Sequence, residues 1–222
     1  MSKVTLIGVT APRIDGVDSA EELVAYAARV SNPSNQMNTA TAPKLLRYLA
    51  KNKHWSPFEM VHVLMEIETT RDIARQILRH RSFSFQEFSQ RYARADELGF
   101  EYREARLQDP KNRQASIETE DYVTQQEWED RQSNVLAHVR RAYEWALDNG
   151  IAKEQARAVL PEGITMSRMY MSGTLRSWLH YCELRTDMAT QKEHRIVAQQ
   201  CQDVLLKEFP SLSEIILNAT NT

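Results

Sequence analysis

The segment RHRSFSFQEFSQRY, residues 79 to 92, gathers side chains that are well suited to bind an anion. Six arginines lie between residues 71 and 94, and only two acids, Asp72 and Glu87, accompany them. The planar guanidinium group binds phosphates and carboxylates through paired hydrogen bonds. Because the chain of 222 residues has a net charge of −2, this local excess predicts a discrete anion pocket rather than a general nucleic-acid surface.

A helix is expected over residues 70–81, where apolar residues recur at helical spacing. Gln76, Arg79 and His80 lie at positions i, i+3 and i+4, so they are expected to project from one face near the helix end. Cations at the end of a helix would also simply complement its dipole. That explanation does not extend to the residues that follow.

Ser89, Gln90 and Arg91 form a second polar group ten residues further on. A hydroxyl, an amide and a guanidinium side by side can hold a phosphate group, with backbone N–H groups assisting. The three phenylalanines that precede this group are expected to serve packing. A different class of protein, a binder of RNA or single-stranded DNA, would instead stack bases on them, and a non-catalytic helical scaffold is a third option.

Several common sites have no support in the sequence. The glycine-rich nucleotide loops and the CxxC and HExxH patterns of metal sites do not occur, so no metal is expected. Only two cysteines are present, Cys182 and Cys201, and both are expected to be packing residues. So few cysteines fit a reducing compartment, so the protein is expected in the cytoplasm, or in the host cytoplasm if it is viral. No apolar run is long enough to predict a membrane span.

The remaining pattern predicts a single mixed α+β domain over residues 1–222. Residues 100–118 are polar and are expected to form a long loop, and the ordered part is expected to end before Pro210. The predicted strands cover residues 3–10, 61–69 and 165–173, and the predicted helices cover residues 18–31, 41–52, 70–81, 121–149, 152–160, 174–185 and 189–208.

Arg79-His80-Arg81, followed after seven residues by Ser89-Gln90-Arg91, resembles the RHR-x7-S-x-R signature of flavin-dependent thymidylate synthases. The resemblance covers most of the chain. Four further segments are similar to blocks of that family: HWSPFE at 54–59, ARQILRHR at 74–81, ARAVLP at 156–161 and LRSWLHYCELR at 175–185.

The resemblance implies an α+β fold with a small mixed or antiparallel sheet packed by long helices. It implies reductive methylation of dUMP to dTMP, with methylenetetrahydrofolate as carbon donor and FAD reduced by NADPH as hydride carrier. It also implies a homotetramer whose active sites are shared between chains, without nucleic acid or membrane as partner.

The same resemblance implies the residues of the site. Arg185 matches the catalytic arginine, placed to stabilise negative charge at N3 of the uracil ring; its spacing from Glu183 and Asp187 does not suit a helical ion pair. The residues implied for dUMP are Gln76, Ile77, Leu78, Arg79, Glu87, Phe88, Ser89, Gln90, Arg91, Arg157 and Arg185. The residues implied for FAD are His54, Ser56 (from a neighbouring chain), Arg79, His80, Arg81, Glu87, Thr174, Arg176 and His180.

Three points are specific to this chain. Thr174 stands where the family often has Asn, and His180 replaces a later Asn. Arg176 and His180 are four residues apart, so they share a helix face and can both contact a flavin. Ser89 is expected to bind dUMP rather than to attack it, because no general base stands beside it in the sequence.

Overall fold

The computed structural model describes residues 2–218, and these residues fold into two compact units. Each unit is assembled from separate segments of the chain. The sheet unit consists of Ser2–Ile67, Ile77–Gln86 and the chain from Met169 onward; the long-helix unit consists of Glu68–Gln76 and Glu87–Arg168.

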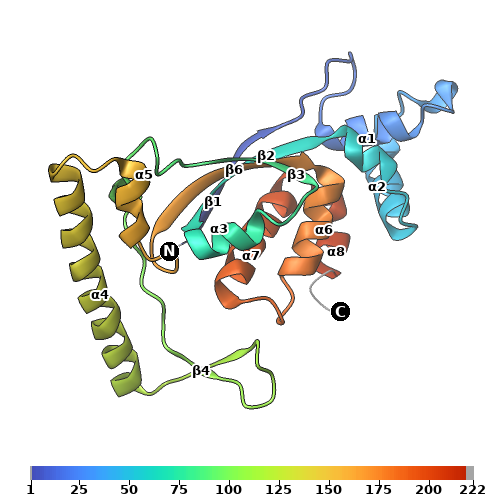
Figure 1. Ribbon diagram of the computed structural model, residues 1–222. Helices are drawn as coiled ribbons and strands as arrows, with labels where there is room; N and C mark the ends of the chain where they lie inside the picture. Colours follow the sequence, from blue (N-terminus) through green and yellow to red (C-terminus); the bar gives the residue numbers. More distant parts are fainter. Residues whose placement is uncertain (1, 219–222) are drawn as a thin grey trace. The chain divides into compact units, whose positions relative to one another are not determined.

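A four-stranded sheet with the strand order β1-β2-β6-β3 is the centre of the sheet unit (Figure 1). The side chains of Val61, Val63, Met65 and Ile67 are fully buried, whereas His62 is exposed, as expected of a strand with one buried face. The strand predicted over residues 61–69 is thereby confirmed. The strands are β1 (Lys3–Val9), β2 (His62–Thr70), β3 (Phe83–Glu87) and β6 (Met166–Thr174), and the last three of these also have residues in the long-helix unit.

Helices cover the sheet and build the core of this unit. Helix α1 begins at a capping box, in which the side chains of Ser19 and Glu22 each accept a hydrogen bond from the other's backbone N–H. Helix α6 contacts β2 through a hydrogen bond of 3.0 Å from Trp178 Nε1 to the carbonyl of Val63. Helix α7 packs against both α6 and β1. The α-helices are α1 (Ala20–Ala28), α2 (Ala42–Lys51), α6 (Leu175–Arg185), α7 (Lys192–Glu208) and α8 (Ser213–Asn218), and the 3-10 helices are η1 (Pro33–Asn35), η2 (Thr39–Thr41), η3 (Ser56–Met60) and η6 (Pro210–Leu212).

The long-helix unit has a small core of its own. Ala95, Tyr143, Ala146 and Ala156 form this core, and the Tyr143 hydroxyl accepts a hydrogen bond of 3.1 Å from the backbone N–H of Ala95. The elements of this unit are α3 (Arg71–Ile77, whose last residue belongs to the sheet unit), η4 (Ala95–Leu98), β4 (Arg106–Gln108), β5 (Ser116–Glu118), α4 (Tyr122–Asp148), α5 (Lys153–Ala156) and η5 (Arg157–Val159).

The polar segment before α4 is held to that helix by two glutamines. Gln132 accepts from the backbone N–H of Arg103 and donates to its carbonyl, both at 2.8 Å, and Gln125 makes the same pair of bonds with Ala105 at 2.9 and 3.1 Å. Because the two glutamines lie seven residues apart, they share one face of α4.

The α+β class and most predicted elements are confirmed, and three expectations are wrong. The helix expected over 70–81 ends at Ile77, because the chain must turn before β3 begins. The expected loop over 100–118 contains the antiparallel hairpin β4–β5, whose turn is closed by the Asp109 carboxylate. The ordered chain continues past Pro210, which is tolerated in the first turn of η6 and is followed by α8.

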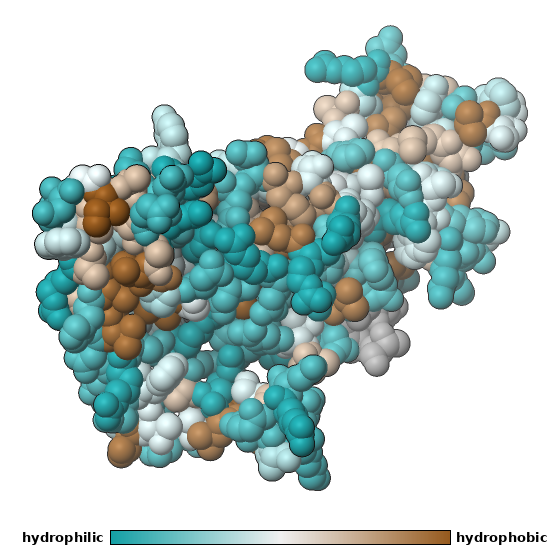
Figure 2. Space-filling model, in the orientation of Figure 1, coloured by the Kyte–Doolittle hydropathy of each residue, from teal (hydrophilic) through white to brown (hydrophobic). Residues whose placement is uncertain are grey.

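An apolar surface lies on α4 and α5 of the long-helix unit, and Figure 2 shows brown side chains gathered over these elements. Trp145 is 61% exposed there, and Ile151 and Val159 are also exposed. Among residues 2–218, no helix is both long enough and apolar enough to cross a bilayer.

Candidate functional site

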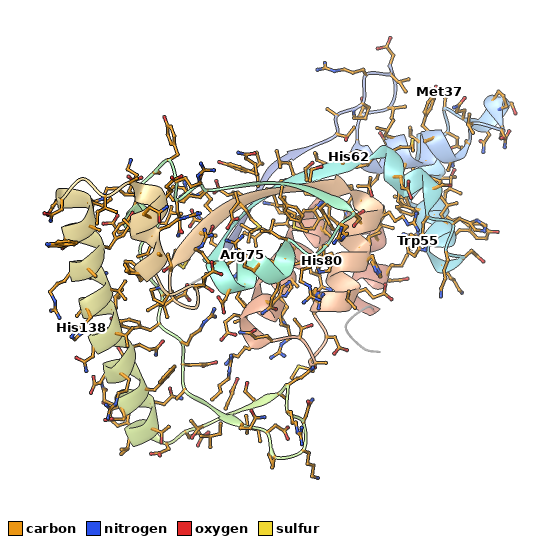
Figure 3. All side chains as sticks on the ribbon, in the orientation of Figure 1. Met37, Trp55, His62, Arg75, His80 and His138 are labelled. Atoms are coloured by element: carbon orange, nitrogen blue, oxygen red, sulfur yellow. The ribbon has the colours of Figure 1, made fainter. Side chains whose placement is uncertain are left out.

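A cavity of about 1070 Å³ opens in the sheet unit, between the end of α2, η3, α6 and α8. Ligand pockets in proteins usually measure about 300–1,000 Å³, so this cavity has room for a large ligand. Trp55, which Figure 3 labels, offers an aromatic ring to it. The other lining side chains that are polar or charged come from Arg47, Lys51, Lys53, Glu59, Ser82, Thr174, Arg176, Ser177, His180, Glu183 and Glu214.

Three of the residues predicted to contact FAD line this cavity. Arg176 forms an ion pair with Glu59, and His180 Nδ1 lies 3.8 Å from the Glu183 carboxylate. Thr174 is the N-cap of α6, where its hydroxyl accepts a hydrogen bond of 3.2 Å from the backbone N–H of Ser177. A helix cap is a role that threonine performs well, so the residue that replaces Asn at this position has a clear structural function.

The sequence motifs did not indicate the cationic wall of this cavity. Arg47 and Lys51 lie one turn apart on α2, and Lys53 follows the helix end. The N–H of His54 donates to the carbonyl of Leu49, which closes a Schellman motif with Lys53 at its left-handed position, φ 57°. Glycine usually occupies that position, so a lysine there places a charge at the cavity at some cost in backbone strain.

His80 and Arg185 are in direct contact in the sheet unit. The Nε–H of Arg185 donates to His80 Nε2 over 2.9 Å. Burial, followed by the positive charges of Arg185, His180 and Arg79, lowers the pKa of His80 from 6.5 to about 4. The predicted catalytic arginine therefore has a neutral histidine as its partner at physiological pH, and not one of the acids beside it in the sequence.

In the long-helix unit, Glu87 lies at the centre of a polar cluster. Its carboxylate accepts a hydrogen bond of 2.9 Å from the Ser167 hydroxyl and lies 3.5 Å from Arg71 Nη1 and 3.8 Å from Arg75 Nη1. Glu162 lies 3.5 Å from each of the same two arginines. Arg75 therefore forms ion pairs with both Glu87 and Glu162.

Arg91 and Arg157 meet at one residue, although they are far apart in the sequence. Both Nε and Nη2 of Arg91 lie 3.2 Å from the Glu154 carboxylate, and Arg157 Nε donates to the Glu154 carbonyl over 3.3 Å. The Arg91 guanidinium can exchange the exposed Glu154 carboxylate for a phosphate group, and Arg157 is held at the main chain of the same residue. The structure thus brings together two arginines that the sequence motifs predicted for the nucleotide.

Gln90, which directly precedes Arg91 in the sequence, has a buried hydrogen-bond donor. The residue is only 4% exposed, and its Nε2 atom has no hydrogen-bond partner among the described residues. Buried amide groups without partners are rare because they are costly. An N–H group in this situation is suited to bind a ligand carbonyl or phosphate oxygen.

Comparison with known proteins identifies the family of this chain. The family described as thymidylate synthase complementing protein matches residues 14–211. A probable flavin-dependent thymidylate synthase of Paramecium bursaria Chlorella virus 1 is 51% identical over 211 residues, which span 95% of this chain and 97% of that protein. The chain belongs to the flavin-dependent thymidylate synthase family.

Other members support the assignment. The flavin-dependent thymidylate synthase of Synechocystis sp. is 49% identical over 213 residues, which span 95% of this chain and 97% of that protein. The crystal structure of a UMP/dUMP methylase, PolB from Streptomyces cacaoi, bound with 5-Br dUMP has a TM-score of 0.82 and 28% identity, and the match covers 98% of this chain and 95% of that one. The family and the enzyme class predicted from the motifs are therefore confirmed.

For this thymidylate synthase family member, the remaining predicted residues are distributed as follows. The cavity lining includes Trp55 and Ser82, which are sequence neighbours of other residues predicted for FAD. It does not include those predicted residues themselves: His54, Ser56, Arg79, His80, Arg81 and Glu87. His54 instead packs edge-on against Tyr48, with ring centroids 6.2 Å apart. Of the other residues predicted for dUMP, Ile77 is buried, Gln76, Leu78 and Phe88 are half-buried, and Ser89 is exposed.

Cys182 and Cys201 are both free and buried, as predicted. Burial raises the pKa of each thiol above its usual value. Neither is therefore suited to act as a thiolate nucleophile. Within the described part of the chain, no group of three or more His, Cys, Asp or Glu side chains is arranged to hold a metal ion.

Proposed function

We propose that this enzyme methylates dUMP to dTMP, with methylenetetrahydrofolate as carbon donor and FAD reduced by NADPH as hydride source. Membership of the flavin-dependent thymidylate synthase family carries the proposal. The relation to a methylase bound with 5-Br dUMP supports a deoxyuridine nucleotide as substrate. A cytoplasmic location, in the host if the protein is viral, is part of the proposal.

The cavity of the sheet unit fits FAD in volume and in chemistry. Trp55 can pack against a ring of the cofactor, while Arg176 and His180 offer donors from one face of α6. When bound and reduced, FAD supplies the hydride that the new methyl group requires. The chain's own residues hold and orient the cofactor there.

In the proposed complex, Arg91 and Arg157 bind the phosphate of dUMP, and Glu154 releases Arg91 when the phosphate arrives. The pair is exposed, so this exchange costs little. The unpartnered amide of Gln90 donates to the nucleotide, and the Ser89 hydroxyl binds it without attacking it. These assignments rest on the family resemblance together with the contacts of the long-helix unit.

Arg185 is proposed to stabilise the negative charge that develops at N3 of the uracil ring. A guanidinium stays protonated at every pH of interest. A fixed cation at the position of developing charge is usually the largest electrostatic contribution to catalysis.

The proposal includes a homotetramer in which Ser56 of one chain and Arg79-His80-Arg81 of another hold the same FAD. The apolar side chains exposed at α4 and α5 are suited to an association between chains. If the site is shared, flavin content should fall when the assembly is diluted apart. Sedimentation that shows a monomer with its full flavin content would contradict the sharing.

The deciding experiment combines an absorbance spectrum with an oxidation assay. The purified protein should be yellow with a flavin spectrum, and it should oxidise NADPH faster when dUMP is added. With methylenetetrahydrofolate present, dTMP should form in proportion to dUMP consumed. A colourless protein that retains single-stranded nucleic acid, or a flavoprotein that forms no dTMP with all substrates present, would overturn the proposal.

A further inference from the structure

The contact between His80 and Arg185 joins two elements that are far apart in the sequence. Arg185 is the last residue of α6, and its Nε–H points to His80, which lies in the turn between α3 and β3. Figure 3 labels His80 in that turn. Both residues belong to the sheet unit.

The chemistry of the two side chains fixes the proton on His80. A guanidinium has only donors, so His80 Nε2 must accept through its lone pair. A histidine that accepts at Nε2 is neutral and carries its hydrogen on Nδ1. Protonation at Nε2 would place two donors face to face and break the contact.

A buried aromatic pair lies behind the His80 ring and holds its orientation. The Tyr181 ring meets it edge-on, with centroids 4.9 Å apart, and His194 Nε2 lies 3.1 Å from the Tyr181 hydroxyl. Tyr181 and His194 are both fully buried. Such a wall leaves the imidazole little freedom to rotate away from Arg185.

The charged and titratable groups that face His80 are Arg79 from its own segment, His180, Tyr181 and Arg185 from α6, and His194 from α7. Arg185, His180 and Arg79 favour the neutral ring, whereas Tyr181 and His194 contact it through their own rings. Burial together with the cations lowers the pKa of His80 to about 4, and burial lowers the pKa of His194 to about 3. The contact is therefore kept at neutral pH and is lost only as the pH falls toward about 4.

We propose that His80 is a positioning residue for Arg185, whose Nε–H it accepts so that the two terminal Nη groups form the edge presented to the substrate. The proposal deepens the proposed function and rests on it, because it assumes that Arg185 faces the uracil ring. It also assigns Tyr181 and His194 a role, as the support that keeps the imidazole in place.

The first test measures the tautomer and does not depend on activity. In protein labelled with ¹⁵N-histidine, the His80 signals are identified by their loss in His80→Gln. At pH 7 they should show a neutral ring with its hydrogen on Nδ1, and in Arg185→Met the tautomer preference should weaken. A charged ring, or an Nε2–H tautomer in the unsubstituted protein, would overturn the proposal even if the enzyme is active. The expected tautomer in a protein without activity would count against the proposed function alone.

The second test separates positioning from flavin binding, because His80 is also predicted to contact FAD. The side-chain oxygen of glutamine can accept the Arg185 Nε–H, whereas leucine cannot, so His80→Gln and His80→Leu form a matched pair. At saturating FAD, with flavin content measured for each variant, His80→Leu should lower kcat by roughly tenfold to a hundredfold, with the KM for dUMP changed much less. His80→Gln should recover most of the loss.

Equal impairment of the two variants, or a defect confined to flavin content, would refute the positioning role. A selective recovery by glutamine supports it, because a purely structural role of the imidazole would not depend on an acceptor atom at that place.

Discussion

Gly173 on β6 allows the Phe83 ring to pack closely against the strand. A Cβ atom added there would lie 2.4 Å from Cδ1 and 2.6 Å from Cε1 of Phe83. Carbon atoms do not approach to such distances, so in Gly173→Ala the phenylalanine ring has to move. Its movement is restricted, because it packs edge-on against Trp178 and Tyr181 at centroid distances of 4.9 and 6.0 Å.

The expected cost follows from overpacking a buried contact. Forcing an extra methyl group into a packed core costs about 1–3 kcal/mol, while alanine regains about 0.5–1 kcal/mol relative to glycine in a strand. The net loss is at most about 2.5 kcal/mol, which corresponds to a Tm lower by up to roughly 10 °C for a chain of this size. Calorimetry or thermal circular dichroism measures this shift.

Gly8 provides the matched control. It also lies in a strand, β1, but nothing is within 4 Å of an added Cβ. Gly8→Ala should therefore leave the Tm unchanged or raise it slightly. If Gly173→Ala proves as stable as Gly8→Ala, then the packing of Phe83 against β6 does not prevent a larger side chain at residue 173. A Phe83→Leu change in the Gly173→Ala background should restore part of the loss, because the two sites are in contact.

Three further predictions concern the candidate site. Glu154→Gln removes the competitor of Arg91 and should tighten dUMP binding, by at most about fivefold because the ion pair is exposed; weaker binding in a calorimetric titration would show that Glu154 contributes to the site. Arg185→Lys should lower kcat by on the order of a hundredfold or more while the dissociation constant of dUMP changes little; a steady kcat with weaker dUMP binding would make Arg185 a binding residue. Cys182 and Cys201 are buried with raised thiol pKa values, so Ellman's reagent at pH 8 should react with them only in denaturant, and prompt reaction of the folded protein would contradict their burial.

Local patterns predicted most of the fold. The strand predicted over residues 61–69 is confirmed by β2, and the helix predicted over residues 18–31 is confirmed by α1, whose N-cap is Ser19. The helix end at Ile77 was missed because tertiary pairing of β3 decides where the helix stops. Propensity alone does not contain that information.

The site was predicted in part, and mainly through motifs. The motifs indicated Arg91 and Arg157, but their convergence on Glu154 depends on the path of the chain between them. The partner of Arg185 could not be inferred from helical spacing, because His80 lies on a different element. The cationic wall of the cavity contains Lys53, which has a left-handed backbone conformation after the end of α2. Sequence rules expect glycine at such a position, so they do not identify a helix end at a lysine.

The strand order of the sheet has a consequence for how the protein is made. Strand β6 lies between β2 and β3, yet it is synthesised long after both of them. Ribosomes add about 5–20 residues per second. Strands β2 and β3 are therefore exposed for several seconds before β6, which pairs with both, has been synthesised. Unpaired strand edges of this kind are the ones that aggregate. Nascent chains that stop before Met166 should therefore depend strongly on chaperones, whereas chains that extend beyond Thr174 can close the sheet and become resistant to proteolysis.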